Sequence, residues 1–466
     1  MSKHITFENT SEGSALISDL IQLLNIQSVE DVAAPNAPFG IAVDEALTYM
    51  LDLGEKYGFK TYNVDHYAGY IEFGEGREML GILCHLDVVP AGEDWHEEPF
   101  NARVVDGKLY GRGSFDDKGP AMTVLYAMKR LKDRGFIPNK RIRLILGTNE
   151  ESGSACMDYY MKHEEIPTLA FSPDADFPVI HGEMGIVICQ IGKTFTDKLE
   201  DGGIKLLSFK GGNAPNMVPD SAEVIIKDTR PVLEIIEAFN ISRDANLSYR
   251  RLEDGSLAIR SKGISAHGST PEKGVNAITD LLAFMDLIDL EIGDSANFVR
   301  FFNRVIGKEL HGESFNLNFV DAYNTLVLNL GMIDMNVDSG SVTINVRYPI
   351  TYKEENVRKG IEKTLSGTGL TIKAWRNASP LFFEKNDPLV QDLMAVYKEV
   401  TGDLEAEPIT IGGGTYARSM PNAVAFGAMF SDSEDRMHQS DEYITTVDLS
   451  KLTDIYEKAI EKLTSR

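Results

Sequence analysis

The sequence predicts an α/β protein in which a mostly parallel sheet, with helices on both faces, forms one domain and an α+β domain is inserted into it. At 466 residues, the chain is longer than single hydrophobic cores usually grow, so two domains are expected. Strand-like and helix-like segments alternate in residues 1–183, short strand-like segments dominate residues 184–383, and the alternation returns in residues 384–466. We therefore expect the first and third segments to form one domain around the second.

Two amphipathic helices open the chain. Apolar residues recur at helical spacing in residues 14–24 and again in residues 43–59, where Gly58 marks a helix end. A short strand in residues 70–74 precedes a nearly continuous apolar run in residues 78–92 that ends in polar residues. This pattern is typical of a buried parallel strand with functional side chains at its carboxyl end.

The next segments continue the alternation of helix and strand. A tight turn in residues 104–119 leads into an amphipathic helix in residues 120–135, with Pro120 near its first position and Gly135 at its end. Another apolar strand follows in residues 140–152. Strands that alternate with helices indicate a parallel sheet.

The alternation of strand-like and helix-like segments stops after Gly182 and resumes near Phe383. Residues 326–350 read as two strands joined by a turn-rich loop, which indicates antiparallel pairing in the inserted segment. The last segment then reads as an amphipathic helix, a pair of strands around a Gly-rich turn, and a closing helix, in residues 388–402, 408–430 and 446–463.

Composition excludes several classes of function. The formal net charge of -25, without any run of Lys and Arg, argues against nucleic-acid binding. No stretch reaches the ~18 uncharged apolar residues of a membrane-spanning helix, and no secretory signal is visible, so we expect a cytoplasmic protein that does not bind a membrane. Three scattered cysteines, Cys84, Cys156 and Cys189, indicate reduced thiols and neither a disulfide framework nor a CxxC zinc site.

Acidic and imidazole side chains follow several of the predicted strands. His85 and Asp87 are two residues apart, so on an extended strand they share a face. Taken alone, such a pair is most often structural, and an adjacent pair of glutamates is most often a solvated loop. However, the same feature recurs at Asp116 and Asp117, Glu150 and Glu151, Asp174 and Asp176, and His438. The carboxyl ends of parallel strands converge on one edge of a sheet, where open α/β folds place their sites.

Carboxylates gathered at one edge would raise one another's pKa unless a positive charge lay among them. A divalent metal is the natural counter-charge, and oxygen ligands with two imidazoles suit zinc or manganese at a hydrolytic site. One carboxylate can bridge two ions about 3.5–4 Å apart, and one glutamate is then left as a base. Because neighbours on an extended chain point in opposite directions, we expect Glu150 and Glu151 to do different jobs.

These residues lie in motifs that resemble the M20 metallopeptidase family, and within it the PepV-type bacterial dipeptidases, which are Xaa-His dipeptidase or carnosinase-like. The motifs are spread over almost the whole chain: "GILCHLDVVPAG", "LYGRGSFDDKGP", "LGTNEESG", "FSPDADFP", "GISAHGSTPEKGVNAI", "NVRYPI", "IGGGTYAR" and "MHQSDE". The resemblance implies a catalytic domain interrupted by a lid domain. It also implies two divalent metal ions per chain, Zn²⁺ or Mn²⁺.

The resemblance assigns the metal site residue by residue. It implies that one ion is bound by His85 and Asp174, that the other is bound by Glu151 and His438, and that Asp116 bridges the two. Asp87 would orient His85, and Glu150 would be the general base. The peptide between Asp116 and Asp117 is expected to be cis.

The resemblance also assigns residues outside the metal site. His267 would stabilise the oxyanion, Arg347 and Asn216 would bind the substrate's terminal carboxylate, and Gly413 and Gly414 would let the backbone approach the substrate. Local sequence allows plainer interpretations: His267 precedes a helix start with Ser269 or Thr270 as cap and Pro271 near the first position, Arg347 could be an exposed strand residue, and Asn216 a turn former. The three glycines at 412–414 lack the following Lys of a phosphate-binding loop.

Three functions are compatible with this site. The first is hydrolysis of unblocked dipeptides of broad side-chain type, and the second is removal of N-acyl or N-succinyl groups from amino acids by the same metals. The third is noncatalytic metal binding or a scaffold role, which the retained Glu150 disfavours because a binding protein needs no base. The resemblance favours the first, and a monomer whose partners are small peptides.

Overall fold

The computed structural model describes residues 6–197, 203–227 and 232–465. The chain forms two compact units. The first unit comprises Met1–His181, Phe383–Ile409 and Gly414–Arg466, and the second comprises Gly182–Phe382 with Thr410–Gly413. The chain passes between the units at three short strands, β9 (Ile180–Glu183), β18 (Leu381–Phe382) and β19 (Ile409–Ile411).

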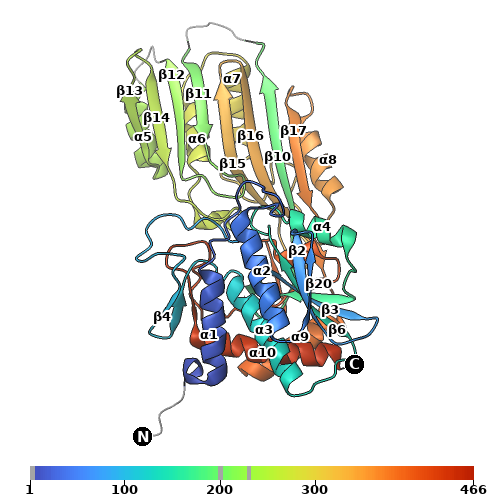
Figure 1. Cartoon of the computed structure of the whole chain (residues 1–466). Helices are drawn as coiled ribbons and strands as arrows, with labels where there is room; N and C mark the ends of the chain where they lie inside the picture. The colour runs from blue at the N-terminus through green and yellow to red at the C-terminus, as the bar shows by residue number, and fades with distance from the viewer. Residues whose placement is uncertain (1–5, 198–202, 228–231, 466) are drawn as a thin grey trace. The chain divides into compact units, whose positions relative to one another are not determined.

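The first unit is built on a sheet whose centre is parallel (Figure 1). Strand β3 pairs in parallel with β6 and β7, and β7 pairs in parallel with β20, whereas β2 joins β6 and β1 joins β2 antiparallel. The predicted α/β class with a mostly parallel sheet is therefore confirmed. In sheet order the strands are β1 (Lys60–Val64), β2 (Ala68–Phe73), β6 (Arg141–Gly147), β3 (Met79–His85), β7 (Leu169–Ser172) and β20 (Ala423–Ala425), followed by β9 and β18, with β19 paired to β9.

Helices lie on both faces of this sheet, as predicted. Alternate residues of β3 and β6, such as Ile82 and Leu144, join the main apolar core. The other face of β6 meets helix α4 (Ala155–His163), where Arg143 Nη1 donates to the Tyr160 hydroxyl at 2.9 Å. The helices that contribute to the core are α1 (Ser11–Leu24), α2 (Ile41–Lys56), α3 (Lys118–Asp133), α9 (Pro388–Thr401) and α10 (Thr446–Thr464).

The predicted tight turn after residue 103 is in fact a hairpin. Strands β4 (Arg103–Val105) and β5 (Lys108–Tyr110) pair antiparallel, and β22 (Tyr443–Thr445) joins β5. Two further short strands, β8 (Ala175–Asp176) and β21 (Ala428–Met429), pair in parallel. A three-residue strand leaves too short a period-2 pattern for the sequence to distinguish it from a turn.

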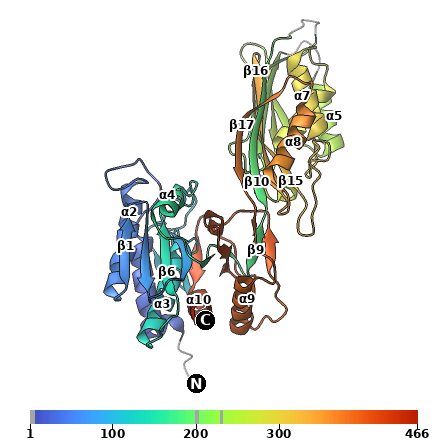
Figure 2. The same cartoon turned by 90° about the vertical axis from the view of Figure 1, so that its right-hand side faces the viewer.

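The second unit is an antiparallel sheet with helices on one side (Figure 2). The predicted strand pair in residues 326–350 is confirmed as β15 (Val327–Asn336) and β16 (Ser339–Tyr348). The sheet order is β13 (Leu247–Arg251), β14 (Leu257–Lys262), β12 (Ser221–Lys227), β11 (Lys205–Gly211), β15, β16, β10 (Gly185–Thr194) and β17 (Thr371–Ala378). The helices are α5 (Leu233–Arg243), α6 (Ala277–Leu287), α7 (Asp294–Val305) and α8 (Glu354–Leu365).

The helix expected directly after His267 starts later than predicted. Pro271–Lys273 form only a 3₁₀ turn, and α6 begins after Asn276, whose side chain accepts from the backbone N–H groups of Ile278 and Thr279. Val275 exchanges backbone hydrogen bonds with Ile264, and this pairing holds the chain extended between the two helical segments. Over the described residues, no helix has both the length and the apolar character needed to cross a membrane.

Candidate metal centre

The carboxyl ends of three parallel strands bring the predicted ligands together in the first unit. Strand β3 ends at His85, and β6 ends at Gly147, three residues before Glu150. Strand β7 ends at Ser172, two residues before Asp174. Because β6, β3 and β7 are parallel neighbours, these ends meet at one edge of the sheet.

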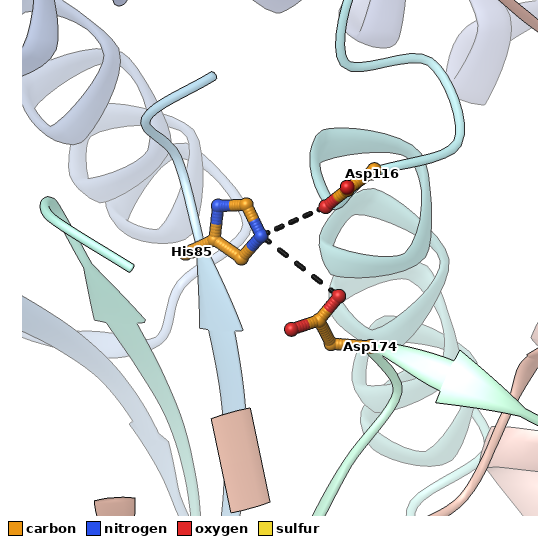
Figure 3. A group of neighbouring side chains, drawn as sticks. All are labelled: His85, Asp116 and Asp174. Carbon is orange, nitrogen blue, oxygen red and sulfur yellow. Dashed lines mark hydrogen bonds and ion pairs between the residues drawn. The ribbon is translucent and has the colours of Figure 1, made fainter. Parts of the chain in front are cut away.

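One group of possible metal ligands consists of His85, Asp116 and Asp174. His85 Nε2 lies 2.9 Å from Asp116 Oδ1 and 3.9 Å from Asp174 Oδ1 (Figure 3). The His85 ring is fully buried. Its Nδ1 lies 2.9 Å from the backbone carbonyl of Asp87, which can only accept, so Nδ1 is the donor and Nε2 faces the carboxylates.

A second group consists of Asp116, Glu151 and His438. His438 Nε2 lies 3.0 Å from Asp116 Oδ2 and 3.2 Å from Glu151 Oε1. The two oxygens of Asp116 therefore face different imidazoles, with Oδ1 toward His85 and Oδ2 toward His438. Asp176 belongs to neither group and is exposed, so of the two aspartates in "FSPDADFP" only Asp174 lies here.

Asp87 contacts both the His85 ring and the turn that carries the two glutamates. Its contact with the His85 ring at hydrogen-bond distance is made by its carbonyl, while its Oδ1 lies 3.6 Å from His85 Nδ1. The Asp87 carboxylate also accepts from the backbone N–H groups of Glu150 and Glu151, at 3.0 Å each. The two glutamates lie in a turn and not on extended chain, so Asp87 fixes the turn that presents both side chains.

A buried carboxylate that the sequence analysis did not single out holds the segment carrying Asp116. Glu442 accepts from the backbone N–H groups of Phe115 and Asp116, at 2.8 and 3.2 Å, and from that of Gly113 at 3.0 Å. It also forms a buried ion pair with Arg112, with Nη1 and Oε2 2.7 Å apart. Glu442 closes the quoted motif "MHQSDE", which was the available signal.

The peptide bond between Asp116 and Asp117 is cis, as expected. Asp117 Oδ2 accepts from the backbone N–H of His85 at 3.1 Å, so the residue after the shared carboxylate fixes the end of β3. The following residue, Lys118, is fully buried and donates to the carbonyls of Leu23 and Ile26 at the end of α1. Asp117 and Lys118 therefore connect the segment after Asp116 to β3 and to the end of α1.

The electrostatics of the protein without metal favour positive charge in the centre. Hydrogen bonds to Asp116 and then to Glu151 raise the pKa of His438 to about 10. Burial tends to lower the pKa of His85, but the hydrogen bonds to Asp116 and Asp87 outweigh it, so the pKa is raised well above its usual value. Burial and the charge of Asp116 raise the pKa of Asp174.

Glu150 lies beside both groups but belongs to neither. Burial raises its pKa to about 7, and the charges of Glu151 and Asp116 add to this effect while that of His85 opposes it. Cys84, which directly precedes His85, is fully buried, and burial raises the pKa of its thiol. The donor set of imidazoles and carboxylates thus suits a hard or borderline divalent ion, and the thiol takes no part in it.

The predicted substrate-binding residues, except Gly414 in the first unit, belong to the second unit. Arg347 is only 4% exposed, which excludes the plainer interpretation as an exposed strand residue. The segments around Asn216 and His267 run side by side, because the Gly268 N–H donates to the Asn216 carbonyl at 2.7 Å. Partial desolvation of the ring, and then the charge of Arg347, lower the pKa of His267.

Comparisons with known proteins agree with this picture. The sequence matches Peptidase family M20/M25/M40 over residues 81–462. A Staphylococcus haemolyticus protein that bears the name "Putative dipeptidase" is 40% identical over 455 residues, which cover 96% of this chain and 97% of the relative. A Staphylococcus aureus protein with the same name is 41% identical over the same share of each chain.

Two solved structures share the fold. Human carnosine dipeptidase 1 has a TM-score of 0.55 at 14% identity, over 98% of this chain and 97% of that one. Aminoacylhistidine dipeptidase from Vibrio alginolyticus has a TM-score of 0.58 at 13% identity, over 99% of both chains. At such identities the likeness concerns architecture alone.

Proposed function

This chain belongs to peptidase family M20/M25/M40, which confirms the predicted resemblance, and from this premise we propose that it hydrolyses unblocked dipeptides of broad side-chain type with two divalent metal ions. The names of the relatives that match it along nearly their whole length support a dipeptide substrate. The proposal keeps the sequence-based expectation of a monomeric cytoplasmic enzyme that acts on small peptides.

The observation that carries the proposal is the position of Asp116. Its two oxygens face two imidazoles, which belong to two groups of possible ligands. A carboxylate shared in this way is what a site for two ions about 3.5–4 Å apart requires. His85 and Asp174 would hold one ion, and Glu151 and His438 the other.

Two bound ions would supply Lewis-acid polarisation of the scissile carbonyl and would lower the pKa of the attacking water. Glu150 would act as general base, taking a proton from that water and passing it to the leaving amine. In the protein without metal, burial raises the pKa of this carboxyl group to about 7, which makes it a stronger base than an ordinary glutamate. Asp87 would keep Glu150 and Glu151 in place by holding their backbone N–H groups.

The second unit would supply substrate recognition. His267 would donate to the developing oxyanion, and Arg347 with Asn216 would bind the terminal carboxylate of the dipeptide. Gly413 and Gly414 would allow close approach of the backbone; a side-chain carbon at Gly413 would meet only Ile411, at 3.7 Å.

The proposal is tested by a substrate panel. Zinc- or manganese-loaded protein is incubated with dipeptides, tripeptides and N-acetyl amino acids, and the released amino acids are quantified. We expect metal-dependent cleavage confined to dipeptides. Cleavage of the N-acetyl amino acids and not of the dipeptides would support the metal site but would identify the protein as a deacylase. Absence of cleavage of every substrate would contradict the proposal.

The role of Glu150 is checked in the same assay. Glu150→Gln is expected to lower kcat by about 10²-fold or more, since a general base contributes that much, while the protein keeps its metal content. Metal content is measured alongside activity because loss of metal would give the same loss of turnover. Full activity of the variant would make the base assignment wrong even if dipeptides are the substrates.

A further inference from the structure

Asn345 and Arg347 lie on the face of the second unit's sheet that faces away from its helices. The alternate residues of β16, including Ile344 and Val346, join the apolar core of this unit. Because side chains alternate along a strand, Asn345 and Arg347 point to the opposite face. Both are nevertheless buried, at 0% and 4% exposed.

Asn345 orients Arg347. Arg347 Nε donates to Asn345 Oδ1 at 2.8 Å, and Nη1 donates to the Gly412 carbonyl at 3.2 Å. Because Nε can only donate, the oxygen of the amide must face it, which fixes the Nδ2 group on the other side. Asn345 Nδ2 is buried and has no hydrogen-bond partner among the described residues.

Asn329 on β15 lies directly opposite Asn345 in the strand register. Its Nδ2 donates to the carbonyls of Met217 and Pro215, at 2.8 and 3.3 Å, and so holds the segment that carries Asn216. Its Oδ1 is buried and, over the part of the chain described, lacks a hydrogen-bond partner. A donor without acceptor and an acceptor without donor thus sit on facing side chains beside Arg347.

A buried donor without a partner is costly, so the unpaired Asn345 Nδ2 is retained at a cost unless a ligand accepts its hydrogen bond. The donor that Asn345 offers and the guanidinium it orients both suit an anion with two oxygen acceptors. A carboxylate is such an anion, and it is the group that an unblocked dipeptide carries at one end. An amide in its place would carry no charge and would offer one acceptor oxygen where a carboxylate offers two.

We propose that Asn345 is a specificity-determining residue of the carboxylate site: its Oδ1 fixes the Arg347 guanidinium, and its Nδ2 donates to the substrate's terminal carboxylate. Asn329 supports the site by anchoring the Pro215–Met217 segment. This assignment rests on the proposed function, because it takes the terminal carboxylate of the substrate as the ligand of Arg347. It adds a residue that the motif "NVRYPI" contains but does not reveal by itself.

The test is the preference for a free carboxylate, measured as the ratio of kcat/KM for a dipeptide to that for the same dipeptide with a C-terminal amide. Asn345→Asp keeps an acceptor for Arg347 Nε but replaces the Nδ2 donor with a negative oxygen. We expect this ratio to fall at least about tenfold, through a higher KM for the free dipeptide and with kcat changed little. Thr343→Asp, which adds the same charge two residues away on the same face, is the matched control and should leave the ratio unchanged.

Asn345→Ser provides a second variant if the aspartate disturbs folding, and thermal unfolding is measured for each variant. It removes the Nδ2 donor without adding charge, so the ratio should again fall. An unchanged ratio in both Asn345 variants, or an equal loss on the dipeptide and its amide, would overturn the assignment and leave Asn345 a structural residue. If the wild-type protein cleaves N-acyl amino acids instead, the proposed function fails while the same ratio, taken with their amides, still tests Asn345.

Discussion

At the scale of single residues, Asp116 is the residue on which the proposal of two metal ions mainly depends. Its two carboxylate oxygens lie 2.9 and 3.0 Å from two different imidazole nitrogens. Hydrogen bonds to His438 and His85 lower its pKa against the opposing effect of burial, so it is ionised at neutral pH. A carboxylate that stays ionised between two imidazoles can bind a cation with each of its oxygens.

The titration of His438 gives a prediction for the metal-free protein. Its pKa is raised to about 10, so at pH 8 the ring carries a proton, whereas metal binding requires the neutral imidazole. We therefore expect zinc binding at pH 8 to release protons, and zinc affinity to rise with pH up to about 10, where the competing proton is lost. Proton release is measured with a pH indicator in weak buffer as zinc is added to chelator-treated protein.

The control for this prediction is His438→Ala, which should release fewer protons per chain at saturation. His85, whose pKa is also raised, would still contribute in that variant. Zinc binding without proton release in the wild-type protein would mean that the imidazoles are already neutral and that the hydrogen bonds to Asp116 do not hold their protons.

Sequence reasoning reached some residues and not others, for physical reasons. His85, Glu151 and Asp174 could be predicted to meet because polar residues at the ends of parallel strands share one edge of the sheet. Asp116 and His438 instead come from the segments after β5 and before β22, which lie outside that sheet. The hydrogen bonds from the backbone of Glu150 and Glu151 to the Asp87 carboxylate could not be predicted, because the sequence does not specify the shape of that turn. The position of Asn329 opposite Asn345 likewise depends on strand register, which the sequence does not specify.

At the scale of elements, the site depends on how the segment after β5 is held. Glu442 accepts backbone N–H groups from Gly113, Phe115 and Asp116 and also pairs with Arg112. It lies one residue before β22, which itself pairs with β5. The segment that carries His438 is therefore joined to the segment that carries Asp116 by both backbone pairing and a buried carboxylate.

Glu442→Gln tests this connection. The amide replaces one acceptor oxygen with a donor that would face N–H groups, and it leaves the buried Arg112 guanidinium without its counter-charge. We expect a loss of about 3 kcal/mol in the free energy of unfolding and a loss of roughly 10-fold or more in metal affinity. Denaturant unfolding and metal content after dialysis measure the two effects.

The matched control is Glu434→Gln, which removes a carboxylate from an exposed ion pair with Arg436 in the same segment. It should leave stability and metal content unchanged, because exposed pairs contribute little. If Glu442→Gln behaves like this control, the Asp116 segment is held by other contacts and Glu442 is not a positioning residue.

The long helices of the first unit followed from the sequence, whereas α5, α7 and α8 of the second unit were not predicted. Helices α1, α2, α9 and α10 had clear apolar periodicity, and side chains of Thr10, Asp387 and Thr445 cap three of them. The hairpin of β4 and β5 was read as a turn, and the helix after His267 was placed too early because the pairing of Val275 with Ile264 is not visible in the sequence. In both cases the observed structure depends on backbone pairing between strands, which local sequence patterns do not show.

At the scale of the whole molecule, the chain divides into two units with separate cores. The candidate metal ligands all belong to the first unit, while Asn216, His267 and Arg347 belong to the second. The fold class could be predicted because a parallel α/β pattern and an antiparallel pattern differ in the sequence. The substrate could not, because the groups proposed to recognise it are single polar side chains on strands and loops of the second unit.

The central claim is that Asp116 is shared by two metal ions that both serve hydrolysis. It is tested most directly by titrating chelator-stripped protein with zinc, and in parallel with manganese, while bound metal per chain and the rate of dipeptide hydrolysis are measured together. We predict that full activity requires two ions per chain, and that Asp116→Asn weakens the binding of both. Full activity with a single ion per chain, or activity that does not depend on added metal, would contradict the account.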